Sequence, residues 1–243
     1  MIPGDPSKLT CPRCGGHKHI LTLRSGNTFD ATVWSDTKHE YPMLPSPSVV
    51  QHCPHCGGYY FYEDSNPTDV PHPDNDELET MKKKGKAEKK KAKELLAVWE
   101  AASDESHRNW FGELSFEQAD AAYDMLFPED LSDEKRDELL FLWLFAFNDQ
   151  YGGRSDKSAE NVCTPELVAK HSAILHHIIE RNERNDLFKA ELYRELGDFV
   201  KCIELASGLL EEDSISEIVA RQIINQAEIA NTKVFPIVFP ADI

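Results

Sequence analysis

Four of the six cysteines in this 243-residue chain occur in two copies of one short pattern. The first copy reads CPRCGG from Cys11 to Gly16, and the second reads CPHCGG from Cys53 to Gly58. Two cysteines three residues apart place their sulfur atoms on one side of a tight turn, as metal-binding turns do. Proline stiffens such a turn by fixing φ, and glycine supplies the positive φ that lets the chain reverse.

Together the two copies offer four thiolates, which fill the coordination shell of one Zn²⁺ and leave no open position for a substrate. The sequence therefore predicts one structural zinc ion per chain, bound by Cys11, Cys14, Cys53 and Cys56. A rubredoxin-like iron site uses similar paired turns and stays an alternative. Redox chemistry at the CxxC pairs is a third reading, although no thioredoxin-like βαβ pattern follows them.

Several histidines invite a metal-binding interpretation, but their surroundings favour simpler roles. Four of them crowd the cysteines, and we expect them on the surface or beside the ligands, because four thiolates already complete the shell. These are His17, His19, His52 and His55. Farther along, His171 and His176 are five residues apart and form no HExxH motif, so His171 is predicted to be a hydrogen-bonded core histidine.

Short β-strands must position the cysteines. Thirty-eight residues separate Cys14 from Cys53, a longer insert than many zinc ribbons contain. Alternating apolar residues predict strands over 19–24, 28–34 and 59–62, with a turn at 25–27. The proline-rich residues 41–47 are expected to be irregular.

Composition excludes some classes of function. The net charge of −17 disfavours nucleic-acid binding across the whole surface, because phosphates would be repelled. The longest apolar run, nine residues from Leu139 to Phe147, is too short to cross a bilayer. Residues 1–5 lack a secretory signal. We therefore expect a cytoplasmic protein that does not bind membranes.

The positive charge is concentrated in one segment. Residues 81–94 contain eight lysines and two glutamates, whereas residues 95–243 contain 13 basic and 30 acidic residues. Residues 63–76 read as a polar linker, and one helix is predicted from about 76 to 102, weakened at Gly85. The lysines are either a solvated helix face that neutralises the acidic body or a basic handle for nucleic acid.

The remaining sequence predicts helices. Ser115 and Gln118 form a capping box for a helix that reaches Leu126 or Phe127. Residues 132–151 form a second helix, apolar on nearly all faces and therefore buried. Thr164 and Pro165 open a third, whose predicted buried stripe is Leu167, Val168, His171, Ile174, Leu175, Ile178 and Ile179.

Residues 190–206 resemble the helix–turn–helix core of a tetratricopeptide repeat (TPR). Tyr193, Gly197 and Phe199 occupy the characteristic aromatic and glycine positions, and Cys202 stands where two helices pack closely. Ser214 and Glu217 predict a capped helix that ends near residue 230. The hairpin is expected at about 186–211, and we find only one convincing copy of it.

Paired CPxCG turns followed by TPR-like helices resemble an uncharacterised group of small bacterial zinc-ribbon proteins. The helix end at 138–149 and the hairpin at 190–206 contribute to the resemblance, which implies architecture only. The predicted fold class is α+β, a small N-terminal β zinc ribbon followed by an all-α helical domain. The expected organisation is a ribbon at 1–65, a linker and lysine-rich helix start at 66–93, and an acidic helical domain at 94–243.

No P-loop, GxSxG, HExxH or paired acid/base signature is present in the sequence. The interpretation is a non-enzymatic adaptor that binds protein partners through its ribbon and helical surfaces. The alternative is a nucleic-acid-binding accessory protein that uses the ribbon and Lys82, Lys83, Lys84, Lys89, Lys90 and Lys91. An enzyme site around His171, Asn148 and Asp149 is a third hypothesis, and the oligomeric state is left open.

Overall fold

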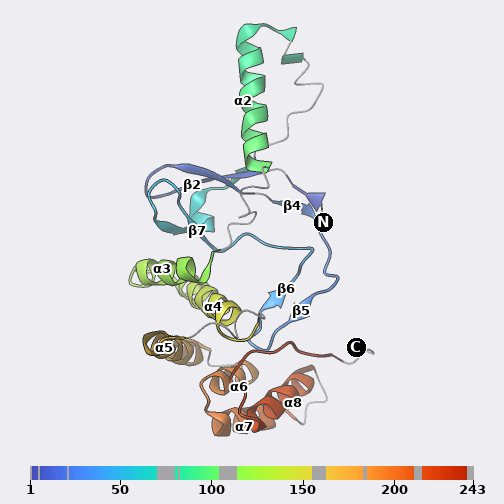
Figure 1. Cartoon of the computed structure of the whole chain (residues 1–243), viewed down its shortest axis with the longest axis vertical. Coiled ribbons are helices and arrows are strands. Elements are labelled where there is room, and N and C mark those ends of the chain that lie inside the picture. Colours follow the sequence, from blue (N-terminus) through green and yellow to red (C-terminus); the bar gives the residue numbers. More distant parts are fainter. Residues whose placement is uncertain are drawn as a thin grey trace. The chain divides into compact units, whose positions relative to one another are not determined.

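The computed structural model describes the chain except residues 1, 5, 21, 70–79, 82, 104–113, 155–162, 183–184, 211–214 and 240–243. The protein is mixed α/β, with small antiparallel sheets in its N-terminal part and, within the described residues, seven helices (Figure 1). It divides into two compact units. The first comprises Met1–Phe29, Tyr41–Leu114 and Asp124–Glu129, and the second Asp30–Glu40, Ser115–Tyr123 and Asp130–Ile243.

The small sheets of the first unit consist of short antiparallel strands. Strand β1 (Ile2–Pro3) pairs with β4 (Leu23–Ser25). Strand β2 (Ser7–Thr10) lies between β3 (His17–Ile20) and β9 (Thr68–Asp69) in a three-stranded sheet. Strand β7 (Val50–His52) pairs with β8 (Tyr59–Phe61). The β2–β3 and β7–β8 hairpins each enclose one CPxCGG segment. Leu9, Ile20, Val50, Tyr60 and Phe61 are buried in the core of this unit.

The strand predicted over 28–34 is wrong in its first half. The observed strand, β5, covers only Thr32–Val33. Asp30 lies at φ 59°, in the left-handed region, and so breaks any extended conformation before it. Phe29, placed by the prediction on a strand face, is 73% exposed. The irregular course predicted for residues 41–47 is confirmed.

The predicted linker and lysine helix both differ from the structure. Residues 63–69 are ordered as the end of the 3₁₀ helix η1 (Tyr62–Ser65) and as β9, whereas 70–76 and the predicted helix start lie outside the described residues. The single helix is interrupted at Gly85, whose φ of 124° is incompatible with a helix. Helix α2 therefore runs from Lys86 to Ser103. Before the break, Met81 packs against Ala92 of α2.

The first two helices of the second unit begin as predicted. α3 (Phe116–Leu126) belongs to this unit as far as Tyr123, and its capping box is confirmed: Ser115 Oγ accepts from the Gln118 N–H at 3.3 Å. α4 (Asp133–Gln150) contains the long apolar run, and none of the residues of that run is exposed. None of the described helices combines the length and apolar character needed to span a bilayer.

Four further helices complete the second unit: α5 (Pro165–Arg181), α6 (Asp186–Glu195), α7 (Phe199–Ser207) and α8 (Ile215–Glu228). The hydroxyl of Thr164 caps α5 as predicted, by accepting from the Leu167 N–H. The C-terminal half of the predicted stripe on α5 is buried. Val168, at its N-terminal end, is 52% exposed.

Helices α6 and α7 form the helical hairpin predicted at 190–206. Gly197 ends the first helix at φ 79°, and Ala190, Cys202 and Ala206 are fully buried where α6, α7 and α8 pack together. The hairpin is thus present, and its relationship to tetratricopeptide repeats stays a prediction. Ser214 of the predicted cap lies outside the described residues.

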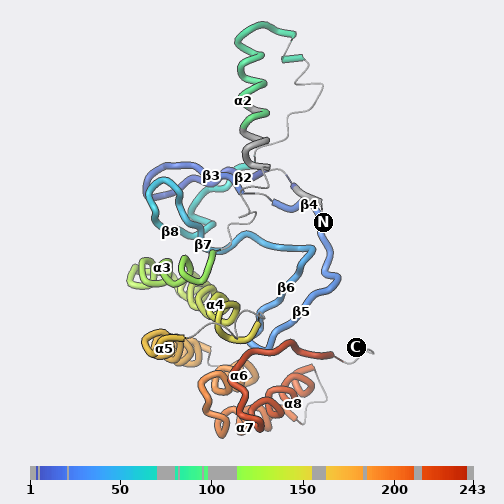
Figure 2. Tube along the Cα trace, viewed as in Figure 1, coloured from blue at the N-terminus to red at the C-terminus, as the bar shows by residue number. Residues whose placement is uncertain are grey.

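The second unit also contains a small sheet, which the prediction of an all-α domain omitted. Strand β5 pairs with β6 (His39–Glu40), so a hairpin between the two cysteine pairs in sequence belongs to the helical unit. The C-terminal segment, red in Figure 2, runs beside this hairpin. The Ser35 N–H donates to the Phe235 carbonyl at 2.9 Å, and the Ile237 N–H to the Val33 carbonyl at 2.7 Å.

Candidate metal centre

Two β-hairpin turns hold the four cysteines, and their backbones are nearly identical. In the first turn the Gly15 N–H donates to the Cys11 carbonyl at 2.9 Å, and the Cys11 N–H donates to the Gly16 carbonyl at 2.8 Å. The corresponding bonds of the second turn, between Cys53 and the glycines after Cys56, measure 3.0 and 2.8 Å. The two CPxCGG segments therefore share one backbone hydrogen-bonding pattern as well as one sequence pattern.

The first glycine of each turn has the conformation predicted from the sequence. Gly15 and Gly57 lie at φ 70° and 69°, a region that residues with a Cβ rarely adopt. The turn also exposes one cysteine of each pair and buries the other: Cys11 and Cys53 are buried, whereas Cys14 and Cys56 are exposed. The cluster thus lies at the surface of its unit, with one sulfur of each pair in the core.

The four sulfur atoms converge to the dimensions of a metal site. All four lie within 4.8 Å of one another, and among the described residues no other group of this kind occurs. Two of the separations are 3.6 Å, between Cys14 and Cys53, and 3.9 Å, between Cys11 and Cys56. A tetrahedral ion with metal–sulfur bonds of about 2.3 Å requires sulfur–sulfur distances of about 3.8 Å. These two separations match the geometry of such an ion, and all six lie within 4.8 Å.

The second glycine of each pattern lets the two turns pack across one another. The ring of His55, from the second turn, lies over Gly16 of the first, and a Cβ at Gly16 would be 2.5 Å from its Cδ2. In the reciprocal contact Arg13, from the first turn, lies over Gly58, where a Cβ would be 3.4 Å from the arginine Cδ. In each turn, the side chain between the proline and the second cysteine therefore packs on the second glycine of the other turn.

This asymmetry predicts different effects for two equivalent substitutions. Gly16→Ala forces the His55 ring to move and should destabilise the metal-loaded protein by roughly 1–3 kcal/mol. Gly58→Ala creates an ordinary van der Waals contact and should change stability by less than about 0.5 kcal/mol. Denaturant unfolding of the two loaded variants checks the difference. Equal effects of the two substitutions would contradict the closer contact of His55 with Gly16.

The nearby histidines are occupied by other contacts. The ring of His55 is bonded through Nε2 to the His17 carbonyl oxygen at 2.8 Å, and His17 Nδ1 is 3.1 Å from the Thr10 hydroxyl. The His52 ring packs against Tyr59 at a centroid distance of 5.2 Å. Within the part of the chain that the structure describes, the candidate metal group contains cysteines alone.

Without a cation, Cys14 and Cys53 ionise unequally. Burial opposes ionisation of Cys53, but the N–H groups of Cys56 and His55 lower its pKa to about 6. The Gly16 N–H favours the Cys14 thiolate, yet the partial loss of hydration at its sulfur and the three neighbouring sulfurs together raise the Cys14 pKa to about 12. A bound divalent cation would supply the positive charge that four thiolates at this separation need.

The two remaining cysteines lie apart from this cluster. Cys202 is fully buried between α6, α7 and α8, and burial raises the pKa of its thiol to about 11. Burial also raises the pKa of Cys163, which is half-buried. Both groups are therefore protonated at neutral pH and suited to packing rather than to nucleophilic chemistry.

The structure places the predicted basic residues on and before α2. Lys83, Lys84, Lys89, Lys90 and Lys91 are exposed, whereas Lys82 lies outside the described residues. Among the described lysines of this segment, only Lys90 has a carboxylate partner, Glu94 at 3.7 Å.

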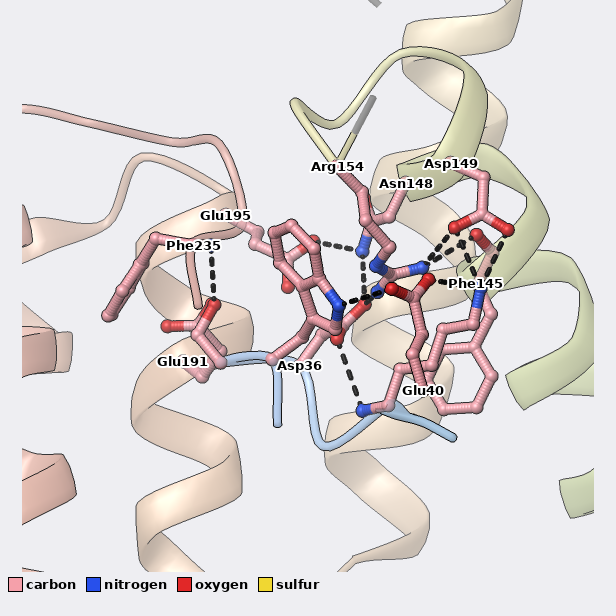
Figure 3. A network of polar contacts seen from close by, with 12 residues as sticks. Asp36, Glu40, Phe145, Asn148, Asp149, Arg154, Glu191, Glu195 and Phe235 are labelled. Atoms are coloured by element: carbon pink, nitrogen blue, oxygen red, sulfur yellow. Dashed lines mark hydrogen bonds and ion pairs between the residues drawn. The ribbon is translucent and has the colours of Figure 1, made fainter. Parts of the chain in front are cut away.

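A buried polar cluster in the second unit was missed by sequence reasoning. The Arg154 guanidinium, 3% exposed, donates to the fully buried Asp36 carboxylate and, at 2.5 Å, to Asp149 (Figure 3). It also donates to the Phe145 carbonyl at 3.1 Å and lies 5.2 Å from the Trp34 ring centroid. The ion pair therefore attaches the β5–β6 hairpin to the end of α4.

Asn148 extends this cluster to α6. Its side-chain amide donates to Asp36 at 2.9 Å and to Glu195 at 3.2 Å. Also on α6, Arg194 donates two hydrogen bonds to Glu191, from Nη2 to Oε1 at 2.5 Å and from Nε to Oε2 at 2.8 Å. Both side chains are fully buried. Asn148 and Asp149 thus make internal contacts, and the enzyme hypothesis built on them gains no support from these positions.

Comparison of the chain with protein-family models, with curated proteins and with solved structures gave no match.

Proposed function

We propose that this protein is a non-enzymatic cytoplasmic adaptor, folded around one structural zinc ion, that binds other proteins through its ribbon and helical surfaces. The observation that carries the proposal is the convergence of four cysteine sulfurs within 4.8 Å. Four protein ligands leave a tetrahedral ion no open position for substrate or water. Such a site contributes folding energy and not chemistry.

Zinc is favoured over iron by ligand type and context. Both metals accept four thiolates at similar distances, so the geometry suits either one. An all-cysteine tetrahedral site in two CPxCGG turns is typical of structural zinc ribbons. An iron-loaded protein would be coloured and redox-active, so the visible spectrum of the purified protein separates the two.

Exposed apolar side chains support a role in protein binding. Phe29, in the first unit, is 73% exposed. In the second unit Val200 on α7 is 81% exposed and Ile229, just after α8, is 71% exposed. In this proposal these exposed apolar side chains are the points at which partner proteins bind.

The adaptor proposal is tested by affinity capture from the native host with single surface substitutions. Phe29→Glu tests the first unit and Val200→Glu tests the second, since neither side chain supports a core. Glu204→Gln, an exposed change on the same helix as Val200, is the matched control. At least one Glu variant should lose specific partners that the wild type and the control retain. Identical partner sets for all four proteins would overturn the proposal.

A second candidate function, nucleic-acid binding, is favoured by the distribution of charge on α2. Lys86, Lys89, Lys90 and Lys93 follow the i, i+3, i+4, i+7 spacing of one helix face, and all four are exposed. Lys91 points away from this stripe. The spacing would let several ammonium groups contact consecutive phosphates of one strand.

Changing Lys89, Lys90 and Lys93 together to Glu should abolish any binding to labelled RNA or DNA. Lys91→Glu, on the other side of α2, is the matched control and should retain most of it. If the stripe contacts phosphates, the wild type should lose affinity steeply with salt, with a slope that reflects about three or four contacts. Wild-type binding that is absent at low salt, or insensitive to salt, would eliminate this candidate.

A further inference from the structure

The buried polar cluster of the second unit contains more carboxylates than cations. Within the described residues the cluster contains three buried carboxylates, Asp36, Glu191 and Glu195, and two buried guanidinium groups, Arg154 and Arg194. The three acids come from the β5–β6 hairpin and α6, so the fold brings them together from distant parts of the sequence (Figure 3). Each arginine can neutralise one acid, which leaves one carboxylate without a counter-charge.

The pairing identifies that carboxylate. Asp36 is paired with Arg154, and Glu191 is paired with Arg194 through two hydrogen bonds. Among the residues that the structure describes, Glu195 receives a hydrogen bond only from the neutral amide of Asn148, at its Oε2 atom. Its other oxygen, Oε1, is buried without a hydrogen-bond partner among the described residues. An ionised carboxylate in this position would be both unpaired and incompletely hydrogen-bonded.

In the described part of the chain, the basic group that lies within 4 Å of the Glu195 carboxylate is His171 on α5. Its Nε2 atom lies 3.8 Å from Glu195 Oε2, and that nitrogen also lacks a hydrogen-bond partner in the described part of the chain. The imidazole ring is stacked on Phe147 at a centroid distance of 4.0 Å and on Trp143 at 6.1 Å. The prediction of a hydrogen-bonded core histidine is therefore met only in part: the side chain is 14% exposed, and its Nε2 atom has no hydrogen-bond partner among the described residues.

The electrostatic surroundings move the two groups in opposite directions. Burial lowers the pKa of His171 to about 4, so the ring is neutral at pH 7. Burial, together with the charges of Glu191 and Asp36, raises the pKa of Glu195 well above its ordinary value, and Arg194 and Asn148 only partly oppose this. The histidine therefore does not supply the missing positive charge.

We infer that Glu195 carries a proton in the folded protein at neutral pH, so that the cluster is a buried proton-binding site linking the β5–β6 hairpin, α4, α5 and α6. The argument rests on the count of buried charges and on the unpartnered oxygen of Glu195. A proton on Glu195 removes the uncompensated charge. The cluster then consists of two ion pairs, Asp36–Arg154 and Glu191–Arg194, beside one neutral acid.

This site makes the stability of the helical unit depend on pH. The folded state holds a proton that the unfolded chain releases near the ordinary pKa of glutamate, about 4.3. The contribution of Glu195 is therefore fully present below that pH and is lost as pH rises toward the raised pKa of the folded state. One such proton changes the folding equilibrium constant by up to tenfold per pH unit over this range.

The test compares two substitutions one helical turn apart on α6. Glu195→Gln keeps the size and neutrality of the protonated acid, so the variant should not lose stability as pH rises. The ratio of its folding equilibrium constant to that of the wild type should therefore increase by up to tenfold per pH unit above about pH 5. Glu191→Gln is the matched control, and it should destabilise the protein because it deprives Arg194 of its buried partner. Denaturant unfolding between pH 5 and 9 measures both.

Infrared spectroscopy of the folded wild type tests the proton directly, whether or not the variants fold. A protonated-carboxyl C=O band at pH 7, shifted by full ¹³C labelling of glutamate, is the expected result. Absence of that band, an imidazolium signal from His171 at pH 7, or equal pH dependence of wild type and Glu195→Gln would each overturn the inference.

Discussion

Replacing Cys53 by serine should abolish metal binding and unfold the β2–β3 and β7–β8 hairpins together. Cys53 is buried, belongs to the core formed with Cys11 and Tyr60, and lies 3.6 Å from Cys14 through its sulfur. Serine offers a poor ligand for zinc and leaves three thiolates crowded without a fourth. Structural zinc contributes on the order of 10 kcal/mol to the folding of small zinc modules, so its loss should exceed the stability of this unit.

Metal content by elemental analysis and hydrogen exchange of the strand amides would measure this effect. Cys163→Ser is the control, because Cys163 is a free cysteine outside the cluster. It should retain both the metal and the protection of the strands. A Cys53→Ser protein with native protection in β7 and β8 would show that the cysteine cluster does not hold the unit together.

The second large effect is expected at Asp36. Asp36→Asn should destabilise the helical unit by about 3 kcal/mol, because removing the fully buried partner of an ion pair leaves the other charge poorly compensated. Arg154 would keep Asp149, which is 46% exposed, as its remaining carboxylate partner. Asn148 would also lose the charged acceptor of one of its hydrogen bonds.

Urea unfolding followed by the helical circular dichroism signal measures this change. Asp30→Asn is the matched control, since Asp30 belongs to the same segment, is exposed, and has a left-handed φ that asparagine accepts well. The control should alter stability by less than about 0.5 kcal/mol. Equal effects of the two substitutions would contradict the buried role of the Asp36–Arg154 pair.

This role of Asp36 changes how the chain should be dissected. A fragment that begins at residue 66 would lack the β5–β6 hairpin and with it the partner of Arg154. Deletion of residues 1–65 would therefore test two things at once, the loss of the metal site and damage to the helical unit. Single surface substitutions such as Phe29→Glu avoid this confusion.

The parts of the structure that were predicted correctly depend on local interactions. The glycine at φ 70° after Cys14 follows from the tight turn alone. The caps at Ser115 and Thr164 are equally local, because each side chain bonds to a residue within one helical turn. The convergence of the two cysteine pairs was predictable across 38 residues because one metal ion requires four ligands. In each case a short sequence pattern is compatible with only one local structure, so the pattern alone predicts that structure.

The parts that were missed depend on distant residues. Asp36 and Arg154 are 118 positions apart, and neither stands in a recognisable motif. The hairpin that carries Asp36 lies between the two cysteine pairs, so its sequence position suggested the ribbon rather than the helical unit. Asn148 and Asp149 did attract notice as polar residues ending an apolar helix. Their partners could not be inferred without the tertiary structure.

The break in the lysine helix has a different cause. Gly85 was expected to weaken a continuous helix by its conformational freedom. In the structure its φ is 124°, and α2 begins only after it, at Lys86. The packing of Met81 against Ala92 gives the preceding residues a contact that a straight helix could not provide. Tertiary packing thus overrides the helical propensity of the lysines and alanines around it.

The central claim, that the cysteine cluster is a closed structural zinc site, is tested most directly by X-ray absorption spectroscopy of protein purified without chelators. We predict about one zinc ion per chain, with four sulfur ligands at about 2.3 Å and no lighter atom in the first shell. An iron edge, a nitrogen or oxygen ligand at the zinc, or protein that folds without stoichiometric metal would contradict the account.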